Sequence, residues 1–139
     1  MIPGLNIDSA TESRIWAAFS NWAEHFKVHL KSGGMQYLLS EYEKLVSSVE
    51  TQSCNHGPFG RRLTGKDWQD CCGISYEYTN DISIRSAIEI ILLNAKDHVD
   101  DDLKEKIASL DNRLFGLYEN RPPRSGQWWH QGLPRGIVE

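Results

Sequence analysis

The sequence predicts an all-α protein: a single-domain irregular bundle of about five helices, with a C-terminal tail packed across it. Four segments repeat apolar residues at the three- or four-residue spacing of a helix face, and none shows the clean two-residue alternation of a strand. The chain has 139 residues, which suits one domain with its own hydrophobic core. Residues 1–120 are expected to form the helical domain, and residues 121–139 a tail containing Pro, Arg and Trp.

The first predicted helix begins at Ser9-Ala10-Thr11-Glu12, where a hydroxyl is followed three residues later by a glutamate, as in a capping box. Its apolar face recurs over residues 15–30, and Gly33-Gly34 is expected to end it. A second amphipathic pattern over residues 35–49 predicts another helix packed on the core.

Residues 51–63 are rich in Ser, Asn, Gly and Pro and are expected to form a loop, which would be near the upper end of ordinary loop lengths. The pattern Thr64-Gly65-Lys66-Asp67 predicts a third helix start, with Trp68 on the inward face. Gly73 interrupts this pattern, so residues 74–79 are compatible with either a helix or an extended segment.

Asn80-Asp81 is expected to cap a central, isoleucine-rich helix over residues 84–93. A helix is favoured over a strand there, because the polar positions do not alternate and no hairpin turn flanks the run. Asp100 is expected to cap the last helix, which Arg121-Pro122-Pro123 ends.

The composition limits the classes of partner. A net charge of −4 disfavours non-specific nucleic-acid binding, which needs clustered Lys and Arg, and it fits a basic protein partner. The three cysteines include a vicinal pair and do not suggest a secreted disulfide framework. The N-terminus lacks the pattern of a signal peptide, and no apolar run approaches the roughly 20 residues of a membrane span. We therefore expect a cytoplasmic protein without membrane contact.

Two groups of residues have the chemistry of metal ligands. His25 and His29 have the i,i+4 spacing of a metal-binding pair but lack the glutamate of a zinc-protease motif, so half-buried boundary residues are the simpler interpretation. The second group is Cys54, His56, Cys71 and Cys72. Their spacing is not a pair of Cys-x-x-Cys motifs, and adjacent cysteines fit a tetrahedral ion poorly. We expect structural or free thiols, with no metal, cofactor or catalytic residue.

Two features suggest a binding surface. Acidic residues gather around the start of the last helix, where helix capping and a solvated surface compete with a patch that meets a basic partner. Adjacent tryptophans in the tail either pack onto the helices or anchor an interface. The candidate partner-binding residues are Asp97, Asp101, Asp102, Glu105, Trp128 and Trp129.

The pattern Leu110-Asp111-Asn112-Arg113-Leu114, followed by Trp128-Trp129-His130-Gln131-Gly132-Leu133-Pro134, resembles the C-terminal part of small immunity proteins from bacterial contact-dependent growth inhibition and polymorphic-toxin systems. In those families a helix with a Leu-Asp-x-Arg-Leu core leads to a Trp-Trp pair and a nearby Pro. The resemblance implies a protein that binds and neutralises a cognate toxin domain, for example a nuclease, by blocking its active site. It implies no catalytic residue. Two alternatives are a small metal- or Cys-dependent enzyme using His25, His29 or the cysteines, and a helical adaptor or regulator.

Overall fold

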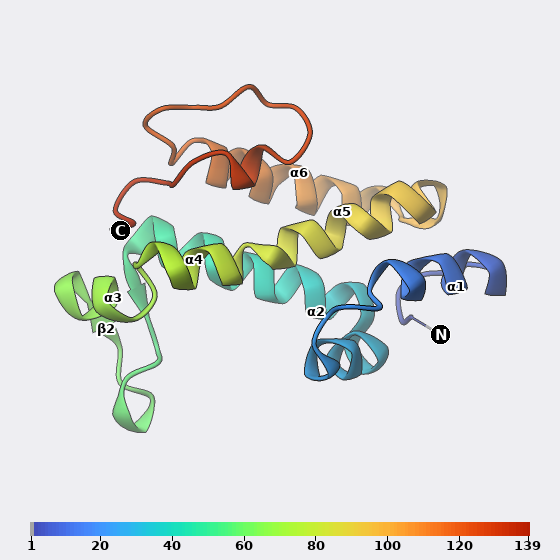
Figure 1. Ribbon diagram of the computed structural model, residues 1–139, viewed down its shortest axis with the longest axis horizontal. Helices are drawn as coiled ribbons and strands as arrows, with labels where there is room; N and C mark the ends of the chain where they lie inside the picture. The colour runs from blue at the N-terminus through green and yellow to red at the C-terminus, as the bar shows by residue number, and fades with distance from the viewer. Residues whose placement is uncertain (1) are drawn as a thin grey trace. The chain divides into compact units, whose positions relative to one another are not determined.

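The computed structural model describes residues 2–139 and is built mainly of α-helices (Figure 1), which confirms the predicted all-α class. Its helices are α1 (Ser9–Ala18), α2 (Glu24–Thr51), α3 (Gly65–Cys71), α4 (Ser75–Asp81), α5 (Ser83–Ala95) and α6 (Asp101–Phe115). The sheet in this part of the chain is a single antiparallel pair, β1 (Ser53–Cys54) and β2 (Leu63–Thr64). Short 3-10 turns are η1 (Pro58–Gly60), η2 (Lys96–His98) and η3 (Trp128–His130). No helix within residues 2–139 is both long and apolar enough to cross a membrane.

The structure contains two compact units. Unit 1 comprises the chain up to Glu41 together with Ile84–Ala108. Unit 2 comprises Tyr42–Ser83 and Ser109–Glu139.

The N-terminal helical pattern of unit 1 is divided between two helices, so the predicted single helix from Ser9 to Gly33 is wrong. The cap of α1 is Asp8, whose carboxylate accepts the backbone N–H of Thr11 at 2.7 Å, in place of the predicted cap at Ser9. The chain leaves the helix after Ala18 and turns through Ser20-Asn21, residue types that favour turns over helix interiors. The apolar spacing continues across this turn because the aromatic residues on both sides meet in one cluster.

That aromatic cluster comprises Phe19, Trp22 and Phe26, with ring centroids 4.8–5.2 Å apart. Phe19 is fully buried. The rings therefore form one core contact although Phe19 and Trp22 lie in the turn after α1 and Phe26 lies on α2.

The predicted break at Gly33-Gly34 is present inside α2. Gly34 has a φ of 57° and a ψ of −140°, which is not helical. A Cβ at this position would overlap the carbonyl oxygen of Pro3, and the neighbouring Met35 N–H bonds that same oxygen at 3.1 Å. Only glycine combines this conformation with so close a backbone approach.

Helix α5 and the start of α6 follow the predicted patterns, but α6 ends at Phe115 and not at the predicted Arg121-Pro122-Pro123. Ala87, Ile88 and Ile91 of α5 are fully buried, so this segment is the expected core helix. Asp100 caps α6 by accepting the N–H of Leu103 at 2.8 Å, as predicted. Asn80-Asp81 does not cap α5: both residues belong to α4, and α5 begins at Ser83.

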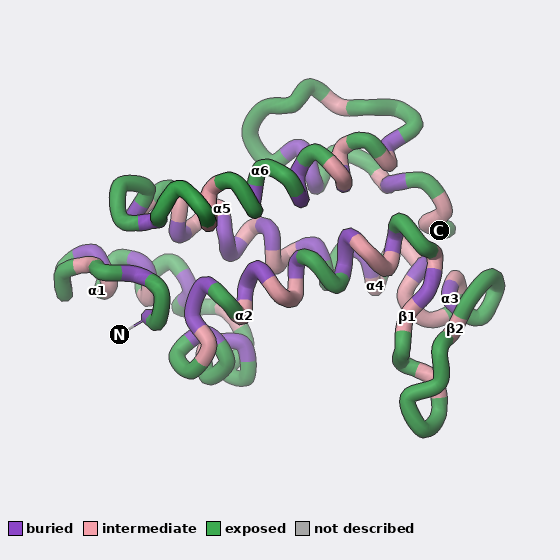
Figure 2. The backbone as a smooth tube through the Cα atoms, turned by 180° about the vertical axis from the view of Figure 1, so that it is seen from behind, coloured by how far each residue is buried: buried purple, intermediate pink, exposed green. Residues whose placement is uncertain are grey.

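In unit 2 the segment after α2 is a short hairpin in place of the predicted irregular loop. Cys54 pairs with Leu63, and Gly57 donates its N–H to the carbonyl of Arg61 at 3.0 Å. Most of the segment between the strands is exposed (Figure 2). Ser75–Asp81 forms α4, so residues 75–79 of the stretch that was compatible with either conformation are helical, while Ile74 before them is extended.

The C-terminal tail packs on the helices of unit 2. Trp128 and Trp129 are 4% and 1% exposed, so both indoles pack against the protein itself, which is the first of the two roles expected for them. Tyr118 donates its hydroxyl to the carbonyl of Trp129 at 3.1 Å. The same hydroxyl oxygen lies 3.0 Å from the hydroxyl oxygen of Tyr78 on α4. Val138 pairs with Ile74 in an isolated parallel bridge, so the tail is held near its end as well.

Candidate functional site

The acidic cluster, defined as Asp97, Asp101, Asp102 and Glu105, lies in unit 1 on η2 and the first turns of α6. All four side chains are exposed. Within residues 2–139 none of them makes a hydrogen bond or an ion pair, whereas neighbouring Asp100 is used as the helix cap. The stretch 96–106 also contains three lysines beside its five carboxylates, so its net charge is acidic but moderate.

An exposed leucine precedes the acidic cluster. Leu93 on α5 is 78% exposed, although Ala87, Ile88 and Ile91 of the same helix are fully buried. Partner surfaces commonly place an apolar anchor within a polar rim. Leu93 was not among the sequence-predicted site residues, because its position also fits the wide apolar face of the helix.

Trp128 and Trp129 lie away from the solvent. The Trp128 ring meets Phe115 edge-on at a centroid distance of 5.2 Å, and the Arg124 guanidinium lies 5.2 Å from the Phe115 ring and 5.9 Å from that of Trp128. In this conformation the two predicted contact residues are part of the tail's packing, and their indoles are not available to a partner.

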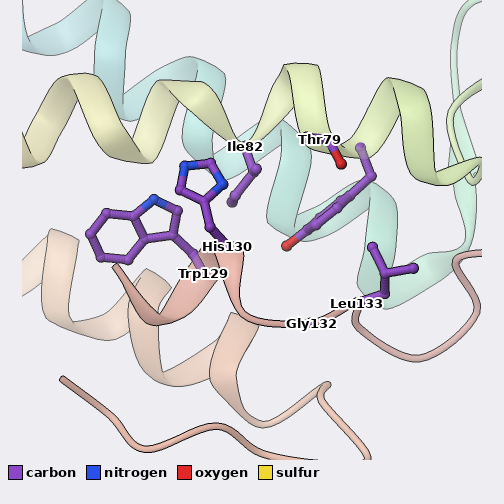
Figure 3. Close-up of a pocket in the computed structure, with 7 residues that line it drawn as sticks. Thr79, Ile82, Trp129, His130, Gly132 and Leu133 are labelled. Atoms are coloured by element: carbon purple, nitrogen blue, oxygen red, sulfur yellow. The ribbon is translucent and has the colours of Figure 1, made fainter. Parts of the chain in front are cut away.

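A pocket of about 230 Å³ lies where the tail meets α4 in unit 2 (Figure 3). Trp129, His130 and Leu133 approach Thr79 and Ile82 across it. Ligand pockets are usually larger, roughly 300–1,000 Å³. Burial lowers the pKa of His130 below its ordinary value, and the residues that line this pocket include neither a carboxylate nor a thiol.

His25 and His29 do not form a metal site with other residues that the structure describes. Both are exposed, where the sequence suggested half-buried positions. His29 donates from Nδ1 to the backbone carbonyl of His25 at 2.6 Å, and its ring lies 5.4 Å from that of Tyr37. The i,i+4 spacing thus produces a helix-surface hydrogen bond.

The four remaining candidate ligands come together in unit 2. The ligand atoms of Cys54, His56, Cys71 and Cys72 all lie within 4.8 Å of one another. His56 is exposed and the three cysteines are partly buried, with all three thiols free. Burial, followed by the neighbouring thiols of Cys54 and Cys71, raises the pKa of Cys72 above its ordinary value.

The sequence pattern did not show this convergence, because the hairpin that returns the chain was not predicted. The available signal was the turn sequence Gly57-Pro58-Phe59-Gly60 between the two pairs of ligands. Phe59 at that turn was also missed as a surface feature: it is fully exposed and has a φ of 58°.

Comparisons of the chain with protein-family models, curated proteins and solved structures found no match.

Proposed function

We propose that this protein is a binding protein that neutralises a cognate toxin domain, and that it acts by covering the toxin's active site without performing catalysis. The C-terminal resemblance to immunity proteins supports the proposal. The motif residues of that resemblance also have defined contacts in unit 2: Asp111 and Arg113 bond α6 to α2, and the carbonyl of Trp129 accepts the hydroxyl of Tyr118.

The observation that carries the proposal is the state of the acidic cluster. Its four carboxylates are exposed and have no partner within residues 2–139, so the fold does not use them for its own side-chain contacts. Exposed charges of one sign attract an oppositely charged protein over several ångströms and accelerate its association. A toxin that acts on nucleic acid carries a positive surface for its polyanionic substrate, and an acidic inhibitor can cover that surface.

Leu93 adds an apolar element to this interpretation. Charged rims contribute mainly to the rate and selectivity of association, while a few buried apolar or aromatic anchors provide most of the binding free energy. With 78% of its surface exposed, Leu93 is available for such a role. Trp128 and Trp129 would contribute indirectly, through the stability of unit 2.

The experiment first looks for a toxin gene directly upstream of this one and then co-expresses its toxin domain with the chain. The wild-type chain should restore growth. The double charge reversal Asp97→Lys/Glu105→Lys should protect less well, because it replaces two of the four carboxylates of the acidic cluster. Both positions lie outside the first two residues of α6, where negative charge stabilises the helix start. The matched control is Glu119→Lys/Glu139→Lys, which makes the same change in net charge at two exposed positions of unit 2.

Full protection by the control and weak protection by the acidic-cluster variant would support the proposal. Equal loss in both variants would assign the effect to net charge alone. Failure of the wild-type chain to protect would overturn the proposed function.

A further inference from the structure

We propose that Cys54, His56, Cys71 and Cys72 bind one Zn²⁺ ion in a closed, four-coordinate site that fastens the β1–β2 hairpin to the end of α3. This inference is independent of the toxin-binding proposal. It departs from the expectation drawn from ligand spacing and from the adjacent cysteines, because the structure brings the ligand atoms of all four residues, Cys71 and Cys72 included, within 4.8 Å of one another.

The distances among the four ligand atoms suit a single small cation. Cys72 Sγ lies 3.0 Å from Cys54 Sγ, 3.1 Å from Cys71 Sγ and 2.9 Å from His56 Nδ1. Cys71 Sγ lies 3.8 Å from His56 Nδ1. Zinc–sulfur bonds of about 2.3 Å at tetrahedral angles place sulfur atoms about 3.7 Å apart. Each of the short sulfur–sulfur separations therefore needs to lengthen by less than about 1 Å to accept the ion.

The ligand chemistry identifies zinc and a structural role. Three thiolates and one imidazole make a Cys₃His set, one of the common structural zinc sites. All four positions would be filled by protein side chains, so no position remains for a water or a substrate. The inferred site therefore does not imply an enzyme.

A disulfide explains the cluster less well. Adjacent residues have Cα atoms about 3.8 Å apart, below the usual 4.4–6.8 Å of a disulfide, so Cys71–Cys72 is a poor pair. A Cys54–Cys72 disulfide is the competing arrangement. It would use two of the four residues and leave the approach of Cys71 and His56 without a function.

The local fold positions the ligands in two pairs. Cys54 lies on β1 opposite Leu63, and His56 follows two residues later in the turn segment. Cys71 ends α3 and Cys72 follows it, with the N–H groups of both Cys72 and Gly73 bonded to the carbonyl of Trp68 at 2.8 and 2.9 Å. This helix end turns the two cysteines towards the hairpin.

The close contact between Gly73 and Trp68 requires a glycine just after the end of α3. A Cβ at Gly73 would lie 2.6 Å from the Trp68 ring, and the indole itself is fully buried. The ring donates from Nε1 to Ser48 Oγ on α2 at 3.0 Å. Cys72 is therefore adjacent to Gly73, whose backbone is held in place by its packing against Trp68.

The hairpin is short, so a metal ion at its base would add to its stability. Its strands have two residues each, and such short isolated hairpins are marginally stable in water. Its turn has little apolar packing, since Phe59 at the tip is fully exposed in a left-handed conformation that is unfavourable for a non-glycine residue. A metal ion joining Cys54 and His56 to Cys71 and Cys72 supplies a restraint at the base of the hairpin.

The first test is the zinc content of untagged full-length protein purified without chelators under reducing conditions. One zinc per chain is expected in the wild type. Cys54→Ser and Cys72→Ser should each lose stoichiometric zinc, while the control His25→Ala/His29→Ala should retain it, since that pair lies on the surface of α2.

Two measurements on the wild type keep the test valid if a cysteine variant fails to fold. Replacement of zinc by Co²⁺ should produce sulfur-to-cobalt charge-transfer bands and the strong visible bands of tetrahedral coordination. Chelation should increase trypsin cleavage after Arg61 and Arg62 in the hairpin without changing cleavage after Arg124, an exposed arginine in the tail.

Wild-type protein without bound zinc that also gives no tetrahedral cobalt spectrum would overturn the proposal. So would a Cys54–Cys72 disulfide found by mass spectrometry in protein freshly isolated from cells with its thiols blocked.

Discussion

Tyr42 on α2 donates its hydroxyl to the carboxylate of Asp111 on α6 at 2.7 Å, and both residues are buried within unit 2. Two positions further along α6, Arg113 forms two hydrogen bonds with Glu50 of α2, at 3.0 and 2.6 Å. The Asp and Arg of the Leu-Asp-x-Arg-Leu pattern thus connect the same pair of helices. This arrangement gives the motif a role in folding, which the sequence resemblance alone did not specify.

Removing the Tyr42 hydroxyl should weaken unit 2. Tyr42→Phe leaves a buried carboxylate with one donor fewer, which is expected to cost about 1–3 kcal/mol of the free energy of unfolding. Urea denaturation measures this loss. Tyr76→Phe is the control, because Tyr76 is 71% exposed and should be neutral. Equal stabilities of the Tyr42 variant and the wild type would show that the hydrogen bond contributes nothing.

The Glu50–Arg113 pair should make stability depend on pH. The hydrogen bonds from Arg113 lower the pKa of Glu50 below its ordinary value of 4.5. The pair therefore stabilises the folded protein above pH 4.5, and this contribution is lost as the pH falls through the lowered pKa of the folded state. Because the pair is partly exposed, we expect about 0.5–1 kcal/mol near neutral pH.

The comparison for that pair is the difference in unfolding free energy between the wild type and Glu50→Gln at several pH values. The difference should be present at neutral pH and disappear in acid. A difference that persists unchanged at low pH would show that the charge of Glu50 is not its source.

Apolar spacing predicted the helices well where one face meets one core. The segments now identified as α5 and α6 followed this rule, and Asp100 was recognisable as a cap because Asp is a preferred N-cap residue just before an apolar helical pattern. The prediction from apolar spacing was wrong over residues 15–30, where one periodic pattern covers two helices. Local signals could not show the turn there, since Phe19, Trp22 and Phe26 stay on a common core across it.

Truncating a tail tryptophan should strongly destabilise the fold. Trp129 is 1% exposed, so Trp129→Ala should cost about 3–5 kcal/mol, and deletion of residues 121–139 should lower the melting temperature. Phe59→Ala is the control for losing an aromatic ring, since that ring is fully exposed. An unchanged melting temperature after the tail deletion would contradict the packing role of the tail.

The close approach of Gly73 to Trp68 predicts intolerance of a methyl group. Gly73→Ala places a carbon 2.6 Å from the ring and should destabilise the protein by about 1–3 kcal/mol. At Gly116 the nearest atom to an added Cβ is 3.4 Å away, so Gly116→Ala should be tolerated. Thermal unfolding of the two variants compares them directly. A Gly73 variant as stable as the Gly116 variant would show that the ring can move aside.

The candidate sites differ in how far the sequence alone could predict them. The acidic cluster was predictable, because its residues are close in sequence and charged side chains near a helix start are usually exposed. The approach of Cys54 and His56 to Cys71 and Cys72 was not predictable, because it requires a hairpin whose strands are only two residues long. Burial of Arg85 was also missed: it lies on the core helix α5 and forms an ion pair with Glu89 at 3.2 Å.

The central claim is that the acidic cluster attracts a basic partner, and the association rate constant with a toxin domain against which the chain protects cells tests it most directly. The rate for the wild type should fall as salt is raised. For Asp97→Lys/Glu105→Lys the rate at low salt should be lower and its salt dependence flatter, with little change in dissociation, while Glu119→Lys/Glu139→Lys should stay closer to the wild type. Association by the acidic-cluster variant as fast and as salt-dependent as that of the wild type would contradict the account.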